Sequence, residues 1–440
     1  MTNTEPLLQD AYIHIGRKLH LLLRTGQMLM ESGADTNRIV RDMKRAAAYM
    51  GIPEENIHLH IMWTTLMLNV SDGDHSYTNF EKCEYHGINM TIISALSKLS
   101  WQAMERHYSL DTYESELDRI QILKSHYSPL LSAIGAGLAC GGFCKLFGCD
   151  WTAFFFTIIC ASIGFRLRCL CNKAQINAYA GIAISAFVTT CLAYLTQFIA
   201  PSTTPWHPMI ACTLFIVPGI PLINAVDDML NNFIVAGMTR SINTLLIVGG
   251  MTFGIVFAIR LCNVDDFTSL SVVPDSTYLI YAIAAAIAAT GFSIIFNVPP
   301  RLLAVSAVGG IISVCLRNFF TLELGMTQVA GSFIGATAVS LIALKAVHWF
   351  HTPVHVLTIP SVIPMIPGVL LYRLLFAIIN VNALDSATLM TAVQSGVTAI
   401  LIIIGIAVGV AVPNIFARRY LEKSKQMHLE ELLSENIKIK

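Results

Sequence analysis

The chain has 440 residues, of which 55% are hydrophobic and only 13% are charged, and its 28 lysines and arginines balance 28 aspartates and glutamates. Soluble domains carry about 25% charged residues, so this composition argues against an ordinary soluble enzyme. The zero net charge also argues against nucleic-acid binding, which needs a basic surface. We therefore expect a membrane protein without a nucleic-acid partner.

The charges are distributed unevenly along the chain. Residues 1–126 hold 28 charged side chains, residues 127–416 hold 18, and residues 417–440 hold ten. This partition predicts a polar N-terminal domain, a long domain in the lipid bilayer and a short charged tail. The first apolar run, Leu19–Leu23, is short and is followed by Arg24, so we expect no signal peptide. The N-terminal domain is therefore predicted to be cytoplasmic.

The N-terminal domain has the patterns of a small α+β fold. Helical spacing and end signals predict four helices, over Tyr12–Met30, Asn37–Met50, Met90–Arg106 and Thr112–Ser125. Asp35 or Thr36 is expected to cap the second of them. Branched and apolar residues predict one strand over His58–Val70, a turn at residues 71–74 and a second strand over His75–Cys83.

Several residues of this domain raise the alternative of an enzyme. Glu31, Ser32 and three histidines (His58, His60 and His75) include a nucleophile, a base and an acid. However, no GxSxG pattern surrounds Ser32. His58 and His60 share one strand face, which suits either a metal or a solvated surface. We expect a regulatory or coupling domain, with no catalytic residues, no metal and no cofactor.

Ten apolar segments of the remaining chain are long enough to span a bilayer. They cover residues 129–147, 151–168, 176–199, 209–226, 242–261, 277–296, 302–316, 326–347, 354–379 and 390–412. If the N-terminus is inside, ten lysines and arginines near the span ends face the cytoplasm and four face the other side. Because positive charge is retained inside, both termini are predicted to be cytoplasmic.

The membrane domain also matches itself at an interval of 149 residues. Gly142-Phe143 aligns with Gly291-Phe292, and Pro218-Gly219 aligns with Pro367-Gly368. The matches predict two five-helix repeats, over residues 127–262 and 263–416. Because five is odd, the second repeat would enter the membrane from the opposite side, as in many secondary transporters. Chance agreement of small and aromatic residues is the alternative.

Both Pro-Gly sites lie well inside apolar segments. Proline removes a backbone donor and breaks a helix, and unpaired backbone at membrane depth must be buried in protein or face a cavity. Paired broken helices are the best sequence indicator of a transporter's binding site. We therefore predict a substrate site at Pro218, Gly219, Pro367 and Gly368, with a plain proline kink as the alternative.

Polar residues follow each break, namely Asn224, Asp227 and Asp228 in the first half and Tyr372 and Arg373 in the second. Ionised side chains near a bilayer core usually face a pathway or a partner. Arg373 suits a substrate carboxylate, which it can hold with two hydrogen bonds. Asp227 or Asp228 suits an ammonium group or a coupling proton. Alternatively, the two aspartates cap a cytoplasmic helix end.

Three segments resemble the threonine/serine exporter (ThrE-type) family in its fused, single-chain form. They are Glu31-Ser32-Gly33-Ala34 with Arg38, Pro218–Asn224 with Asp227 and Arg240, and Ile363–Gly368 with Tyr372-Arg373. The resemblance implies an exporter of small polar metabolites in a bacterial inner membrane, driven by the proton-motive force. Some split relatives are linked to succinate export, so the substrate does not follow from the family.

Charge offers one guide to the substrate. A zwitterionic amino acid needs one cation and one anion in its site, whereas a dicarboxylate needs two sets of cations or strong donors. Arg373 with Asp227 and Asp228 favours the zwitterion. Taken with this charge pattern, the resemblance implies proton-coupled antiport of threonine or serine. A dicarboxylate exporter, an uncoupled channel and a membrane-anchored hydrolase remain alternatives, and assembly of several copies stays open.

Overall fold

The computed structural model describes residues 5–71, 75–84, 86–264, 277–350, 352–379, 381 and 385–439. The chain forms two compact units. The N-terminal unit comprises Met1–Lys124, Asp227–Arg240 and Ile415–Lys440, and the membrane unit comprises Ser125–Val226 and Ser241–Asn414. The sequence predicted a domain over residues 1–126 but did not indicate that residues 227–240 would join it.

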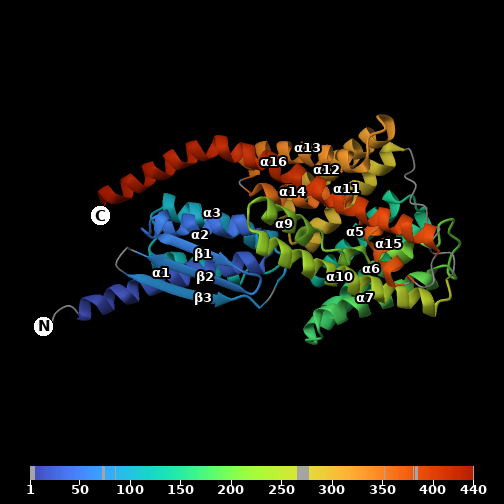
Figure 1. Ribbon diagram of the computed structural model, residues 1–440, viewed down its shortest axis with the longest axis horizontal. Coiled ribbons are helices and arrows are strands. Elements are labelled where there is room, and N and C mark those ends of the chain that lie inside the picture. The colour runs from blue at the N-terminus through green and yellow to red at the C-terminus, as the bar shows by residue number, and fades with distance from the viewer. Residues whose placement is uncertain are drawn as a thin grey trace. The chain divides into compact units, whose positions relative to one another are not determined.

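The N-terminal unit contains a three-stranded antiparallel sheet in the order β1-β2-β3 (Figure 1). Its strands are β1 (Ile57–Ile61), β2 (Thr65–Ser71) and β3 (Ser76–Lys82). The prediction of a single strand over residues 58–70 is wrong, because a hydrogen bond of 2.9 Å from Met62 N to Thr65 O closes a tight hairpin there. The next strand, predicted over residues 75–83, is confirmed as β3.

Four longer helices accompany the sheet, as predicted: α1 (Glu5–Glu31), α2 (Thr36–Tyr49), α3 (Met90–Glu105) and α4 (Leu110–Gln121), with a short helix η1 (Glu54–Asn56) before β1. The predicted cap is confirmed, since the Asp35 side chain accepts a hydrogen bond from Arg38 N at the start of α2. Leu66 and Leu68 are buried under the helices, while Phe80 is 67% exposed. The sheet therefore has one packed face and one open face.

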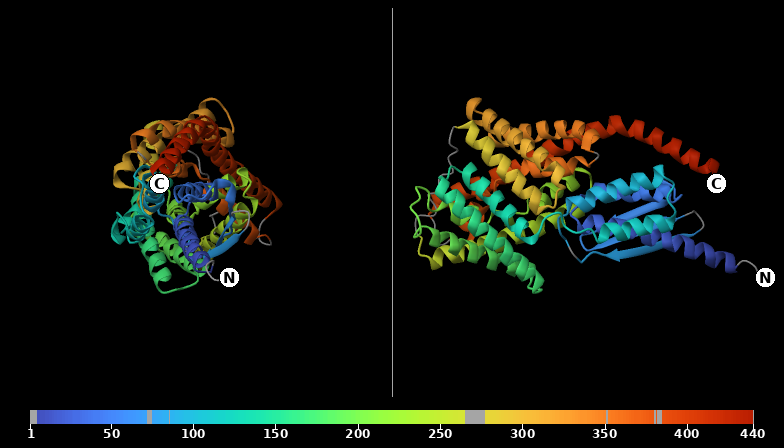
Figure 2. Two further views of the ribbon diagram at one scale, coloured as in Figure 1. Left: turned by 90° about the vertical axis from the view of Figure 1, so that its left-hand side faces the viewer. Right: turned by 180° about the vertical axis from the view of Figure 1, so that it is seen from behind.

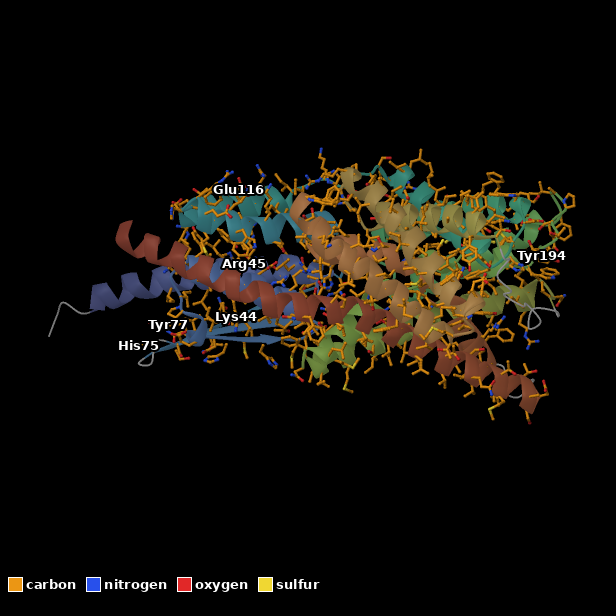
Figure 3. The ribbon with its side chains drawn as sticks, turned by 90° about the horizontal axis from the view of Figure 1, so that it is seen from above. Lys44, Arg45, His75, Tyr77, Glu116 and Tyr194 are labelled. Atoms are coloured by element: carbon orange, nitrogen blue, oxygen red, sulfur yellow. The ribbon has the colours of Figure 1, made fainter. Side chains whose placement is uncertain are left out.

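A polar contact joins α2 to α3 within this unit. Arg45, labelled in Figure 3, donates to Asp42 Oδ1 at 3.3 Å and to Ser100 Oγ at 3.0 Å. Its guanidinium also lies 4.1 Å from the ring centre of Trp101. Burial lowers the pKa of Arg45, although Asp42 opposes that shift. The unit is thus held by buried charges as well as by its apolar core.

The remaining segments are helical. They are α5 (Pro129–Leu146), α6 (Trp151–Lys173), α7 (Ala178–Thr196), α8 (His207–Ala211), η2 (Leu214–Ile216), α9 (Gly219–Leu230), α10 (Ile234–Leu261), α11 (Tyr278–Ile295), η4 (Pro300–Leu302), α12 (Leu303–Asn318), η5 (Phe319–Glu323), α13 (Gln328–Phe350), α14 (Val354–Val362), η6 (Ile363–Met365), α15 (Gly368–Ile379) and α16 (Ser386–Ile439). Helix α16 has 54 residues and leads to the C-terminus (Figure 2).

Within the described residues, eight helices are long and apolar enough to cross a membrane, and ten if each of two bent helix pairs counts as one span. Each of the ten spans predicted from the sequence coincides with one of these helices or pairs. The chain is therefore a multi-pass helical membrane protein. This finding agrees with the low charge content of residues 127–416.

Several segment boundaries recur at the 149-residue interval. The helices α5 and α11 begin and end 149 residues apart, as do η2 and η6, and α9 and α15. Left-handed backbone also recurs, at Gly148 with φ 89° and at Asn297 with φ 54°. Each of these two residues comes after the first helix of its half and turns the chain towards the next one.

Candidate functional site

The two Pro-Gly sequences interrupt their helices in the same way. The first pair, residues 207–216 and 219–230, bends by 55°, and the second, residues 354–365 and 368–379, bends by 56°. Gly219 N donates to Val217 O at 2.8 Å, and Gly368 N donates to Ile366 O at 2.9 Å. Each bond closes a three-residue turn around a proline, which fixes its own φ and has no N–H. The predicted breaks are confirmed, and a plain kink is excluded.

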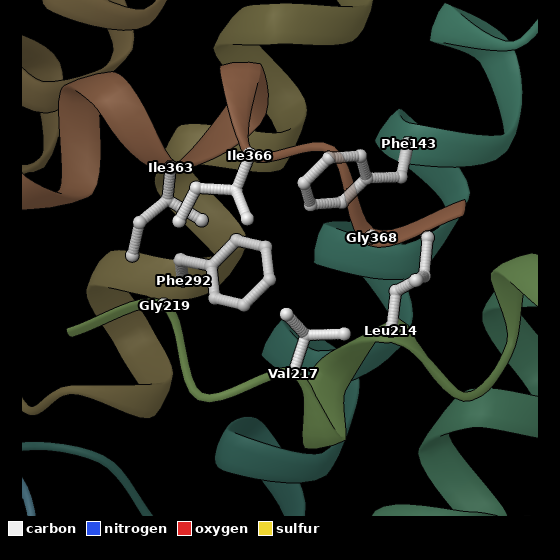
Figure 4. Close-up of a pocket in the computed structure, with 8 residues that line it drawn as sticks. All are labelled: Phe143, Leu214, Val217, Gly219, Phe292, Ile363, Ile366 and Gly368. Carbon is white, nitrogen blue, oxygen red and sulfur yellow. The ribbon is translucent and has the colours of Figure 1, made fainter. Parts of the chain in front are cut away.

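The two breaks meet at one small cavity of about 10 Å³ (Figure 4). Its eight lining residues form four pairs separated by 149 positions: Phe143 and Phe292, Leu214 and Ile363, Val217 and Ile366, and Gly219 and Gly368. The rings of Phe143 and Phe292 meet edge to face, with centroids 5.7 Å apart. The cavity is apolar and has room for about one water molecule.

The glycines allow the breaks to approach each other closely. A Cβ atom on Gly219 would lie 2.7 Å from Ile366 Cδ1, and one on Gly368 would lie 2.9 Å from Leu214 Cδ2. Each glycine therefore receives a side chain from the opposite break. Larger residues at these positions would push the two breaks apart.

The polar candidates lie further along the same helices. Asn224 on α9 and Tyr372 on α15 are buried, with 2% and 3% of their surface exposed, and Arg373 is partly buried. Asn224 and Arg373 each come five residues after the glycine of their break. At 3.6 residues per turn, five residues correspond to about 140° around a helix. This phase explains why Gly219 and Gly368 line the cavity whereas Asn224 and Arg373 do not.

Asp228 belongs to a buried cluster of the N-terminal unit that we call the Asp228 clamp, consisting of Thr36, Asp228 and Arg240. Asp228 accepts hydrogen bonds from Thr36 N at 2.8 Å and Thr36 Oγ1 at 2.9 Å. Arg240 Nε lies 2.9 Å from Asp228 Oδ2. Since Thr36 is the first residue of α2, the positive end of that helix also stabilises the carboxylate.

The clamp continues through Arg240 into the N-terminal fold. Arg240 Nη2 donates to Ala34 O at 3.0 Å, and the guanidinium lies 5.7 Å from the ring centre of Trp63. Trp63 in turn stacks on His86, with ring centroids 3.9 Å apart. Burial, helped by the charge of Arg240, lowers the pKa of His86 to about 4. This histidine is therefore neutral at pH 7.

The sequence analysis named Asp228 but did not find its partners. Asp227, next to it, is 4% exposed and also belongs to the N-terminal unit. The available signal was a pair of opposite charges, Asp228 and Arg240, twelve positions apart in a segment with few charges. The contribution of Thr36 had no comparable signal, because it lies 192 residues away in the sequence.

The predicted N-terminal motif forms the turn between α1 and α2. Gly33, with φ 84°, ends α1, and the amides of Gly33 and Ala34 bond back to Met30 O and Leu29 O. Arg38 is buried and lies 3.2 Å from Asp35 Oδ2. Glu31 and Ser32 line a second cavity, of about 270 Å³.

Neither expected sign of a hydrolase or metal centre is present in the described part of the chain. The residues that line the cavity beside Glu31 and Ser32 include no histidine. His58 and His60 are exposed on β1. No group of three or more His, Cys, Asp or Glu side chains among the described residues is arranged to hold a metal ion.

The number of apolar helices and the two broken pairs define a polytopic membrane protein. Residues 20–262 match the family model ThrE, described as "Putative threonine/serine exporter", and residues 281–416 match ThrE_2, described as "Threonine/Serine exporter, ThrE". The chain belongs to the ThrE family, a family of membrane exporters.

Relatives include a protein named as a transporter subunit and a protein named as an exporter. The chain is 26% identical to the "Probable succinate transporter subunit YjjP" of Escherichia coli over 55% of this chain and 93% of the relative. It is 20% identical to the "Threonine/serine exporter" of Corynebacterium glutamicum over 84% of this chain and 77% of that protein. No solved structure matches the chain.

Proposed function

We propose that this protein is a secondary active transporter that exports a small polar metabolite, threonine or serine first, by proton-coupled antiport. The observation that carries the proposal is the meeting of two equally bent helix breaks at one cavity lined by four pairs of residues 149 positions apart. Broken helices at corresponding positions of two halves are typical of transporter binding sites.

The proposed architecture is an inverted repeat of five and five spans. Supporting it are the shared segment boundaries and the left-handed Gly148 and Asn297 at the same interval. An odd number of spans reverses the second half in the membrane, so the two breaks would approach the site from opposite sides. The distribution of positive charge favours both termini in the cytoplasm. Membership of the ThrE family, with its bacterial relatives, supports a location in a bacterial inner membrane.

In this proposal, transport requires the breaks to separate. A cavity of about 10 Å³ has no room for an amino acid. Separation of Gly219 from Ile366, and of Gly368 from Leu214, would open a path between α9 and α15. Rotation of either helix would then turn Asn224 or Arg373 towards that path. The glycines thus serve as closing contacts, and the polar residues bind the substrate.

Two observations favour an amino acid over a dicarboxylate. The Corynebacterium exporter aligns with 84% of this chain, whereas the succinate transporter subunit aligns with 55%, although at a higher identity of 26% against 20%. In addition, the sequence has one cation, Arg373, after the second break and, after the first, one carboxylate outside the Asp228 clamp, Asp227. A zwitterion matches this separation of charge. A succinate-type exporter is the second candidate, and the name of the split relative supports a test of oligomeric state.

The test is efflux of labelled threonine, serine and succinate from preloaded proteoliposomes, with and without a pH gradient. Arg373→Ala should abolish efflux, and Arg373→Lys should restore little, because lysine lacks the two-pronged geometry. Asp227→Asn should retain substrate exchange but lose the response to the pH gradient. Arg301→Ala, at an exposed arginine, is the matched control.

Normal efflux by both Arg373→Ala and Asp227→Asn at normal expression would contradict the proposed site. Efflux of succinate alone would transfer the proposal to the dicarboxylate class. Efflux that ignores the pH gradient in the unmodified protein would contradict proton coupling but not export.

A further inference from the structure

The larger of the two cavities described above lies entirely within the N-terminal unit. It is therefore separate from the cavity at the helix breaks. We call it the Glu31 pocket. It has a volume of about 270 Å³, whereas a single water needs about 10–15 Å³ by the same measure. Its walls come from the end of α1, the segment 87–92 and the end of α4. The space is therefore sufficient for a small metabolite.

The pocket walls combine one acid with several neutral polar groups. Glu31 supplies a carboxylate, Gln27, Asn89 and Gln121 supply amides, and Met28, Ile88 and Ile92 form an apolar side. No Lys, Arg or His is among the described residues that line it. A ligand group facing Glu31 therefore gains most if it is positively charged.

The acidic residues near Glu31 also favour a positively charged ligand group. Burial raises the pKa of the Glu31 carboxyl. Hydrogen bonds from the Gln27 side chain and the Glu84 backbone oppose that shift, and the charges of Glu81 and Glu84 reinforce it. Like-charged neighbours of this kind disfavour an isolated carboxylate and favour a bound cation. A dicarboxylate would be repelled from the same position.

Ser32 adds a polar group to the pocket wall. It is only 5% exposed and lines the pocket, so its hydroxyl can donate to or accept from a ligand there. Gln121 also lines the pocket. Arg24 donates to its side-chain carbonyl oxygen, so the amide nitrogen of Gln121 can donate to a ligand oxygen.

We propose that the Glu31 pocket is a binding site, separate from the transport path, for a small ligand that carries an ammonium group and neighbouring oxygens, such as a zwitterionic amino acid. The ammonium binds Glu31, and the ligand oxygens meet Ser32 and the amide of Gln121. The apolar residues Ile88 and Ile92 accommodate a short side chain. The proposal does not depend on which metabolite is transported.

The position of this site gives it a route to the Asp228 clamp. Glu31 O and Ser32 O accept the amides of Gly87 and Asn89, both at 2.9 Å. Two residues after Ser32, the carbonyl of Ala34 accepts from Arg240, and Thr36 binds Asp228. A ligand that reorders this turn therefore acts on the last residues of α9 as well.

The experiment measures equilibrium binding to the full-length protein in lipid nanodiscs, with threonine, ethanolamine and succinate as probes. All measurements are repeated in an Arg373→Ala background, which removes the carboxylate-binding arginine of the proposed transport site. Threonine and ethanolamine should bind in that background, and succinate should not. Glu31→Gln should weaken the binding of both amines about tenfold or more, because it removes a charge-assisted hydrogen bond.

Two further variants make the result decisive. Gln121→Trp, at an exposed position on the pocket wall, should also abolish binding by filling the space. Glu55→Gln, at an exposed glutamate away from the pocket, should bind like the unmodified chain. Unchanged amine binding in Glu31→Gln and Gln121→Trp, no amine binding in the Arg373→Ala background, or preferred binding of succinate would each overturn the proposal.

The experiments test the proposed transport function and the proposed Glu31 pocket separately. Loss of efflux with retained ethanolamine binding would contradict the proposed function alone. Retained efflux without ethanolamine binding would contradict the pocket alone. Monodisperse elution of each variant in size-exclusion chromatography establishes that a loss of binding is not a loss of fold.

Discussion

The two Pro-Gly breaks share their backbone geometry but are succeeded by different side chains. Both bend by about the same angle, 55° and 56°, and both place a glycine against the opposite break. After the first, α9 reaches Asp227 and Asp228, and Asp228 is held by Thr36 and Arg240. At the matching positions after the second, α15 has Phe376 and Ala377.

The comparison distinguishes the backbone geometry of the breaks, which both halves share, from the charged residues after them, which differ. The Pro-Gly sequence determines the break locally, so both halves have it. The charged residues are specific to one half: the acids come after the first break, and Arg373 comes after the second. We therefore expect substitutions at the breaks to act alike in both halves, and substitutions of the charged residues to act in one half only.

Asp228→Ala is expected to have the largest effect on stability. It leaves Arg240 buried without its carboxylate, which destabilises a fold by about 3–5 kcal/mol. Denaturant or thermal unfolding of the purified protein should show the loss. The double variant Asp228→Leu with Arg240→Met should recover only part of it. An apolar pair of similar size leaves no charge unpaired, but it removes the hydrogen-bond partners of Thr36 and Ala34.

Ala377→Gly, at the position that matches Asp228 in the second half, is the control and should cause a smaller loss. If the Asp228→Ala variant were no less stable than the Ala377→Gly variant, the buried ion pair of Asp228 and Arg240 would contribute nothing to stability. The contrast between the two halves would then rest on sequence alone.

Gly219→Val and Gly368→Val come next in size. Each adds atoms where a Cβ would already lie 2.7 Å from Ile366 or 2.9 Å from Leu214, and overpacking of this kind destabilises by about 1–3 kcal/mol. Because the contacts are reciprocal, both variants should reduce efflux to a similar extent. Gly249→Val is the control, since no atom lies within 4 Å of a Cβ built there.

A difference of more than about tenfold in efflux between the two valine variants, equivalent to about 1.4 kcal/mol, would show that the breaks are not equivalent. Equal losses would sharpen the comparison by assigning the common behaviour to the Pro-Gly geometry. The measurement requires equal amounts of each variant in the proteoliposomes.

Asn37→Ala is expected to have the smallest effect. Asn37 Nδ2 donates to Asn231 Oδ1 at 3.0 Å beside the clamp, and loss of one partly buried hydrogen bond costs about 1 kcal/mol. The unfolding midpoint should fall slightly, with efflux retained. Asn56→Ala, in the short helix before β1, is the comparison variant. A loss as large as that of Asp228→Ala would mean that the hydrogen bond, and not the ion pair, holds the segment.

Local patterns predicted much of the fold. The ten apolar segments followed from length and hydropathy, the breaks from prolines in apolar runs, and the cap at Asp35 from its place before a helix. The hairpin between β1 and β2 was missed because residues 62–64 are Met-Trp-Thr, without the glycine, proline or asparagine that mark most turns.

The candidate site was harder to predict than the fold. The 149-residue repeat associated Gly219 with Gly368, and both line one cavity. Proximity in sequence to the breaks also suggested polar residues whose helical phase turns them away from that cavity. The Asp228 clamp depends on partners 192 and 12 positions away, and no short motif contains all three residues. The pocket beside Glu31 depends on α1, α4 and the segment before α3 coming together in space.

The Asp228 clamp also sets an order of events during synthesis. A ribosome synthesises α1, the sheet and α4 long before Asp228 and Arg240. Asp228 lies 192 residues after its partner Thr36, and Arg240 lies 206 residues after its partner Ala34. Until those residues emerge, the start of α2 has no carboxylate at Thr36. The N-terminal unit is therefore completed only after α5 to α9 have been made. Its maturation would report that the first half of the membrane domain has been synthesised.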